Sequence, residues 1–166
     1  MTSDELHASR GTARTDPPQD TPPVVTPELL QRVRAAGRDA TPEEVLSAVV
    51  DDLRDGDVAD VSLPEALVTQ SLDEILIALI ALRDDDTHGT GLMDDVERLF
   101  DVRPSPGTVY PRLHDLEADD TLVRHDLVQT KQYAIDDATD AEALIEDALY
   151  QHLTMGLFLH AALDAV

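Results

Sequence analysis

One short window of this sequence, Val102 to His114, combines side chains that bind anions with an absence of acids. It holds two arginines, a serine, a threonine and a tyrosine, in a chain whose formal net charge is −23. Hydroxyls and guanidinium groups donate hydrogen bonds to phosphate oxygens, and a guanidinium can also bond the two acceptors on a guanine edge. A basic window in so acidic a chain indicates contact with an anionic partner. The alternative is a chance gap in the placement of the acids.

A helix is predicted to present this window. Ser105 is a favourable N-cap, because its hydroxyl can accept a hydrogen bond from an amide of the first turn. Pro106 follows at the first helical position, where its missing N–H costs nothing. Val109, Leu113 and Leu116 recur at spacings of four and three, which places them on one apolar face. The other face then carries the hydroxyls and the cations.

This helix follows another one after a short turn. The stretch from Gly91 to Phe100 has the apolar spacing of a helix, so the pair forms a helix-turn-helix. The second helix of such a unit, here about residues 105–119, enters the DNA major groove with its N-terminal residues at the base edges. We expect Arg112 to read a base and Arg103 to hold a phosphate; Tyr110 is placed at the DNA, the alternative being the core. The residues predicted to meet DNA are Arg103, Ser105, Gly107, Thr108, Tyr110, Pro111 and Arg112.

Elements on both sides complete this domain. Ser71 caps a helix whose stretch from Ile75 to Leu82 is apolar nearly all round, which predicts a central, buried position. The residues from Leu122 to Asp126 and from Lys131 to Ile135 alternate as the strands of a hairpin. Arg124 and Lys131 are expected to point outward near the duplex. The alternative is an ordinary hairpin that contacts only solvent.

The amino-acid sequences of these segments resemble the motifs of a known family. Residues 104–111, P-S-P-G-T-V-Y-P, are similar to the recognition-helix signature of PadR-family transcription regulators. Residues 88–92, H-G-T-G-L, resemble that family's H-G-Y-x-L, with Thr90 standing where the family has an aromatic residue. Residues 131–133, K-Q-Y, resemble its R-K-Y-Y at the end of the wing. The wing tip, residues 127–130, lacks the usual glycine.

The resemblance extends over about residues 71–135 and the helix that follows. It implies a winged helix-turn-helix domain that binds double-stranded DNA. It also implies a dimer joined through C-terminal helices, as in other PadR-like proteins.

A long amphipathic helix is predicted from Ala141 to the end, and it is too apolar to remain uncovered. Phe158 and Leu159 widen its apolar stripe to nearly all sides. We therefore predict a homodimer, which would bring two recognition helices to half-sites about one DNA turn, ~34 Å, apart. The residues expected at the dimer contact are Leu144, Ile145, Ala148, Leu149, His152, Leu153, Leu157 and His160.

The predicted fold is mainly α with a small β-hairpin. Thr26 and Thr41 each precede Pro-Glu, the pattern of a helix start. The predicted organisation is a disordered tail (1–25), an N-terminal helical extension (26–56), a linker (57–70), the winged helix-turn-helix domain (71–135) and the C-terminal dimerisation helix (136–166).

No group of residues points to catalysis, a metal site or a cofactor. The chain has no cysteine, which excludes disulfides and thiolate zinc sites. His88 is interpreted as a turn histidine that bonds a nearby backbone group. There is no apolar run of membrane-spanning length and no signal-peptide pattern, so a cytoplasmic, non-enzymatic protein is expected.

The acidic residues show a further bias. Aspartate outnumbers glutamate, and Lys131 is the only lysine beside 11 arginines. This composition resembles that of proteins from salt-in halophilic archaea. At 1 M salt the Debye length is only ~3 Å, so a dense carboxylate surface is tolerated. We expect K⁺ ions to accompany these carboxylates at the DNA interface.

Two functions are compatible with the sequence. The first is a dimeric, sequence-specific DNA-binding transcription regulator adapted to high salt. The alternative is a winged-helix interaction module without DNA binding, which would use Arg32, Arg34, Arg38 and the apolar C-terminal helix. The acid-free window favours the first, because a module that binds only proteins has no evident need of it.

Overall fold

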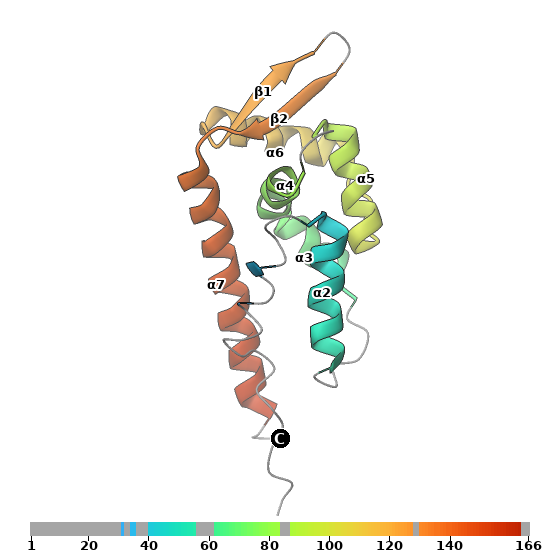
Figure 1. The fold of residues 1–166 in the computed structure, drawn as a ribbon, viewed down its shortest axis with the longest axis vertical. Coiled ribbons are helices and arrows are strands. Elements are labelled where there is room, and N and C mark those ends of the chain that lie inside the picture. The colour runs from blue at the N-terminus through green and yellow to red at the C-terminus, as the bar shows by residue number, and fades with distance from the viewer. Residues whose placement is uncertain are drawn as a thin grey trace, which may run out of the picture.

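The computed structural model describes residues 31, 34–35, 40–55, 62–83, 87–127 and 130–163. The predicted tail (1–25), most of the first N-terminal helix and the side chains of Arg32 and Arg38 lie outside these residues. In chain order the elements are α2 (Pro42–Asp55), α3 (Glu65–Gln70), α4 (Leu72–Ala81), α5 (Gly89–Phe100), α6 (Pro106–Ala118), β1 (Leu122–Asp126), β2 (Lys131–Ile135) and α7 (Ala138–Leu163), as Figure 1 shows.

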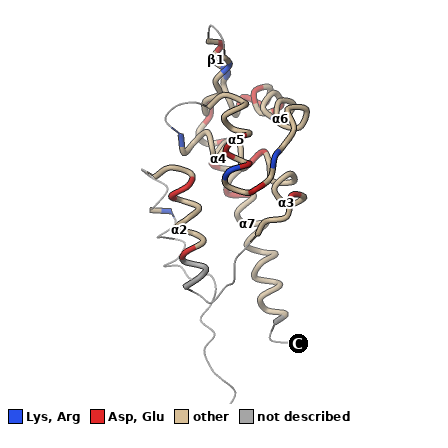
Figure 2. The backbone as a smooth tube through the Cα atoms, turned by 90° about the vertical axis from the view of Figure 1, so that its right-hand side faces the viewer, with Lys and Arg blue, Asp and Glu red and all other residues tan. Residues whose placement is uncertain are grey.

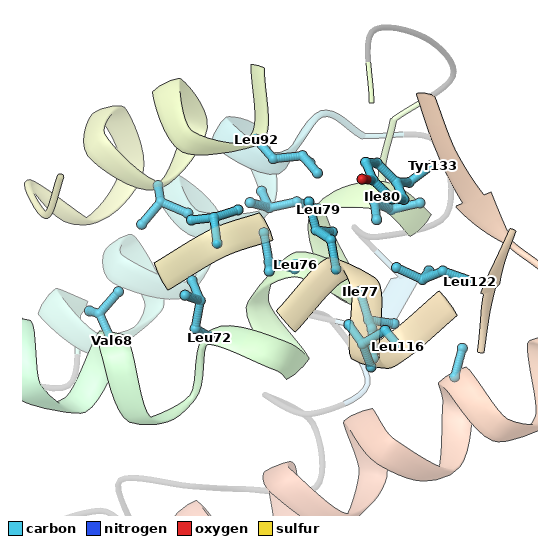
Figure 3. Close-up of a cluster of buried hydrophobic side chains, with 14 of the residues drawn as sticks. Val68, Leu72, Leu76, Ile77, Leu79, Ile80, Leu92, Leu116, Leu122 and Tyr133 are labelled. Carbon is cyan, nitrogen blue, oxygen red and sulfur yellow. The ribbon is translucent and has the colours of Figure 1, made fainter. Parts of the chain in front are cut away.

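This arrangement confirms the predicted fold class: helices with one antiparallel hairpin, in the order of a winged helix-turn-helix. Helix α4 lies at the centre of the domain and contacts α3, α5, α6, α7 and β2. Its Leu72, Leu76 and Ile77 are fully buried, and Leu79 and Ile80 are nearly so (Figure 3). Burying each such side chain contributes roughly 1.5–3 kcal/mol, so α4 supplies much of the core.

The helix-turn-helix consists of α5, a turn over residues 101–105, and α6. Asp101 ends α5 in the left-handed conformation, with φ of 55°, which reverses the chain direction. Val102, the next residue, is 6% exposed and anchors the turn in the core. The angle between the two helices is therefore set by a buried side chain as well as by the turn.

The wing is joined to the body through the segment that precedes α5. Strands β1 and β2 pair from Leu122 opposite Ile135 to Asp126 opposite Lys131. The Tyr133 amide donates to the Thr87 carbonyl at 3.2 Å, and the Thr87 hydroxyl donates to the Tyr133 carbonyl. These bonds fix β2 beside the start of α5.

The N-terminal extension packs against the same body. Thr41 and Glu44 form a capping box at the start of α2, because the Thr41 amide donates to Glu44 Oε2 at 2.8 Å and the Glu44 amide to Thr41 Oγ1 at 3.4 Å. Glu43 pairs with Arg98 of α5. Arg98 in turn pairs with Asp95, whose side chain is only 2% exposed.

The predicted linker over residues 57–70 is wrong in its last part. Residues 65–70 form helix α3, and Val68 is buried in the core at 1% exposure. The domain core therefore begins before Ser71, where the sequence placed its boundary. The short helix lacks the long apolar periodicity that would have revealed it.

Helix α7 begins at Ala138, three residues earlier than predicted. Asp137 caps it, since Oδ1 accepts from the Thr139 amide at 2.7 Å and from the Asp140 amide at 3.2 Å. These amides hold the pKa of the Asp137 carboxyl below its ordinary value, the Asp140 amide having the larger effect. The first half of α7 lies along the domain, and the second half extends away from it (Figures 1 and 2).

Asp137→Ala is expected to lower the thermal unfolding midpoint, because the first turn of α7 loses its cap. The folded-state pKa is depressed, so this contribution is present above the ordinary aspartate pKa of about 3.9 and is lost as pH falls through the folded value. Thermal unfolding followed by circular dichroism near neutral pH and near that pKa measures the difference. Asp137→Asn, which keeps an acceptor, is the control; equal loss in both variants at neutral pH would contradict the capping role.

Candidate nucleic-acid interface

Helix α6 buries one face and leaves the other open. Val109 and Leu113 are fully buried, and Leu116 is 7% exposed. The opposite side is exposed at Ser105, Gly107, Tyr110, Pro111 and His114. The acid-free window of the sequence therefore forms the outward face at the front of the second helix. Such a face suits the major groove, which admits an α-helix.

The front of α6 is built differently from the expectation. Pro106 occupies the first helical position as predicted. Ser105 sits at the N-cap, but its hydroxyl bonds the Thr108 hydroxyl at 2.9 Å and does not cap an amide. The Thr108 amide bonds the Ser105 carbonyl instead, at 2.9 Å. The positive end of the helix dipole still points outward here, which favours an anion such as phosphate.

Arg112 lies elsewhere than predicted. Its Nη1 donates to Asp73 Oδ2 of α4 at 2.8 Å, and its Nη2 lies 3.4 Å from the Thr69 carbonyl of α3. The side chain is 32% exposed and leaves the flank of α6 toward these helices. Arg112, which was predicted to contact a base, therefore links α6 to helices α3 and α4 in this structure. An arginine that points outward from α6 would have to stand at another position of the helix, because position 112 lies on the flank that faces α3 and α4.

Arg124 of the wing is also held within the chain. Its Nη1 donates to Glu117 Oε2 of α6 at 2.8 Å, and its Nε lies 3.4 Å from Asp126. The side chain is 29% exposed, so this bridge fixes the hairpin against α6 more than it offers a charge to a partner. Burial raises the pKa of the nearby Tyr133 phenol, and Arg124 opposes that rise. The phenol stays neutral at physiological pH.

Two of the predicted cations remain accessible. The Arg103 side chain is 80% exposed and lies 3.4 Å from Glu97, a loose surface pair. Lys131 is exposed on β2, across the strand pair from Asp126. His114 of α6 is a third exposed polar group on this surface, and its Nδ1 lies 3.4 Å from Glu117. The candidate interface is thus less basic than the sequence suggested.

The side chains that the sequence did not reveal are carboxylates. Asp73 forms an ion pair with Arg112, and Glu117 forms one with Arg124. Asp95 pairs with Arg83 at 2.7 Å beneath α5. Charge alone gives no signal for such pairs in a chain with 35 acidic residues. His88 behaves as predicted, because its Nδ1 accepts from the Gly91 amide at 2.7 Å. Within the described part of the chain, no three His, Asp or Glu side chains gather as metal ligands would.

Comparison with known proteins agrees with this geometry, which is that of a winged helix-turn-helix protein. Residues 77–143 match the family described as the transcriptional regulator PadR-like family. The match covers most of the winged helix-turn-helix part of the chain, and the resemblance to the PadR family stated from the sequence is confirmed. No solved structure matches the chain. None of the helices in the described residues has the length and apolar character needed to span a bilayer.

The chain is also similar to named proteins of haloarchaea. It is 38% identical over 102 residues to transcriptional activator GvpE1 of Halobacterium salinarum, covering 61% of this chain and 53% of that protein. It is 43% identical over 94 residues to transcriptional activator GvpE of Haloferax mediterranei, covering 57% and 48%. The chain thus spans about half the length of these curated relatives. The family and the names are those of transcription regulators and not of enzymes.

The tie between α6 and α4 has a measurable energy. Arg112→Ala and Asp73→Ala are each expected to lower the free energy of unfolding, with a coupling of up to about 1 kcal/mol, because the pair is partly exposed. Guanidinium unfolding of both single variants and the double variant measures this coupling. Arg103→Ala, which removes a loosely held surface arginine, is the control and should have little effect. Additive effects of the two substitutions would show that the tie contributes nothing.

Proposed function

We propose that this protein is a dimeric, cytoplasmic transcription regulator that binds specific double-stranded DNA sequences through the outward face of α6. The observation that carries the proposal is the acid-free front of that helix, exposed on the second helix of a PadR-like helix-turn-helix. Helix N-terminal amides, hydroxyls and Arg103 are the groups that would contact phosphates there. Base reading falls to the exposed Tyr110, Pro111 and His114 rather than to Arg112.

The internal ion pairs explain how so acidic a protein would meet DNA. A phosphate that recruited Arg112 or Arg124 would have to displace Asp73 or Glu117, and the freed carboxylate would then take up a cation. Such an exchange releases few counterions overall, so it adds little to the salt dependence of binding. Among the cations predicted to meet DNA, Arg103 and Lys131 are left to give the ordinary effect in each protomer.

High salt is the setting in which this arrangement works best. At 1 M salt charges are screened beyond ~3 Å, so repulsion between the acidic surface and DNA is short-ranged. We propose that K⁺ ions bound by carboxylates accompany the protein at the interface. The haloarchaeal origin of the relatives supports this setting.

DNA binding is tested by fluorescence anisotropy in KCl, with DNA from just upstream of the protein's own reading frame. We expect specific binding whose log–log dependence on salt is no steeper than about −4, from two accessible cations in each of two protomers. Arg103→Ala should weaken binding about tenfold and reduce the slope by about 2, because each dimer loses two phosphate contacts.

The matched control is Arg34→Ala, which removes an equally exposed arginine that pairs with Glu142 on α7. It should leave affinity unchanged. Equal effects of the two substitutions would mean that α6 does not define the contact. A slope near that of ordinary basic DNA-binding proteins, about −10, would contradict the role given to the internal pairs.

Dimerisation is proposed from the second half of α7. Residues 148–163 contain no charged side chain, in a chain with 28% charged residues (Figure 2). Tyr150, Met155, Phe158 and Leu159 are each more than half exposed, at 57–69%. An apolar surface of this extent on a helix that leaves its own domain requires a cover. A second copy supplies one through the same surface, as two-fold symmetry allows.

The predicted dimer residues divide into two sets. Ile145 packs against the core, Ala148 is 8% exposed, and His152 Nε2 lies 3.1 Å from the Ser71 hydroxyl. These three contact the protein's own domain, so we leave them out of the proposed dimer contact. The proposed contact consists of Leu149, Leu153, Met155, Leu157, Phe158 and Leu159, with His160 at its end; Leu144, 39% exposed, lies at its upper margin.

Phe158→Asp is expected to convert the dimer to a monomer, because it places a charge in the apolar contact. Light scattering coupled to gel filtration in molar KCl measures the mass. Ala143→Asp, which adds the same charge at an exposed position nearer the start of α7, is the control and should remain dimeric. A monomeric wild-type protein would overturn the proposal outright.

A second function is favoured by the same ion pairs. With Arg112 and Arg124 neutralised, the outward face has little positive charge, which suits an interaction module that binds no DNA. The anisotropy titration separates the two functions. Absence of binding to the upstream DNA and to genomic DNA, in a correctly dimeric protein, would assign the chain to the second class.

A further inference from the structure

Gly89, the first residue of α5, lies directly beneath the ring of Tyr110 from α6. A Cβ atom added to Gly89 would be 2.5 Å from Tyr110 Cε1, 2.9 Å from Cζ and 3.0 Å from the hydroxyl oxygen. Real Cβ contacts lie well beyond 3 Å. No glycine in the described residues has a positive φ, so the conformation of the backbone does not require glycine here. The requirement comes from space.

Three elements meet at this point. The segment before Gly89 bonds strand β2, through Thr87 with Tyr133 and through a bridge between His88 and Gln132. Tyr110 reaches it from α6. A groove between these elements opens on the same side, and it is lined by His88, Gly89, Thr90, Tyr110, Asp126, Leu127, Thr130 and Lys131. The position of the Tyr110 ring therefore determines the shape of the groove between α5, α6 and the wing.

We propose that Gly89 is a positioning residue for DNA recognition: its bare backbone seats the Tyr110 ring against α5. This inference rests on the proposed function, because Tyr110 lies on the face of α6 that is proposed to contact DNA. Tyr110 is 41% exposed, so one edge of the ring is held by Gly89 while the rest faces outward. A larger residue at position 89 pushes the ring outward, into the space that DNA would occupy.

The fold itself should tolerate such a change. The atoms that a Cβ meets belong to the far end of a side chain, which can rotate away, and not to the backbone. Alanine also favours helix over glycine. Gly89→Ala should therefore leave the thermal midpoint within about 2 °C of wild type, while it displaces the ring.

The first test needs no DNA. In a parent variant with Tyr133→Phe and Tyr150→Phe, Tyr110 is the only tyrosine, and the chain has no tryptophan. Gly89→Ala in this parent should raise the acrylamide quenching constant of tyrosine fluorescence about twofold, because the ring leaves its seat. An unchanged constant would overturn the seating. Gly156→Ala, where an added Cβ meets nothing within 4 Å, is the matched control.

The second test is a double-substitution cycle in the anisotropy assay. Gly89→Ala should weaken DNA binding about fivefold to tenfold, the scale of one specific contact. In a Tyr110→Ala background the same substitution should have no further effect. Equal weakening in both backgrounds would show that Gly89 acts without Tyr110, which overturns the proposal.

The two tests separate the inference from the proposed function. If the quenching constant rises but no form binds DNA, wild type included, then Gly89 does position the Tyr110 ring, but not for DNA recognition. Normal binding by Gly89→Ala, with the ring displaced, would also reject that purpose.

Discussion

The structure depends on the burial of the apolar side chains of one helix, α4. Helix α4 places Leu72, Leu76 and Ile77 at zero exposure, and α3, α5, α6, α7 and β2 all pack around it. A helix that is apolar all round is stable only where neighbours cover every face. Helix α6 is one of those neighbours, through Val109 and Leu113. The outward face of α6 is therefore the side that does not pack against α4.

The excess of acidic residues determines where the arginine side chains of the domain bind. Carboxylates far outnumber arginines, so an arginine that comes near the body of the domain meets one. Asp95, Asp73 and Glu117 tie α5, α6 and the wing by such pairs. The pairs of Arg112 and Arg124 remove charge from the surface that would face DNA, and all three pairs add rigidity where the elements join. A protein that works in concentrated salt loses little by this, because long-range attraction is screened there in any case.

Helix α7 belongs both to the domain and to the proposed dimer contact. Its first half belongs to the domain, where Ala141 and Ala148 are buried. Its second half is uncharged and exposed, and in the proposed dimer it meets a second copy of the chain. A single continuous helix that serves both purposes would hold two domains at a fixed separation, since its residues share one rigid axis. Such a connection is what paired half-sites on DNA require.

The sequence by itself determined the elements that depend on local spacing. The apolar positions 109, 113 and 116 placed α6, and an approximate alternation of apolar and polar residues placed both wing strands at their observed bounds. These patterns are readable because helix and strand periods are properties of neighbouring residues. Only the tertiary structure decided that Arg112 pairs with Asp73, 39 residues away, that Ile145 faces inward, and that Gly89 lies beneath Tyr110. Those contacts depend on which faces of distant elements meet, and packing fixes that for the whole domain at once.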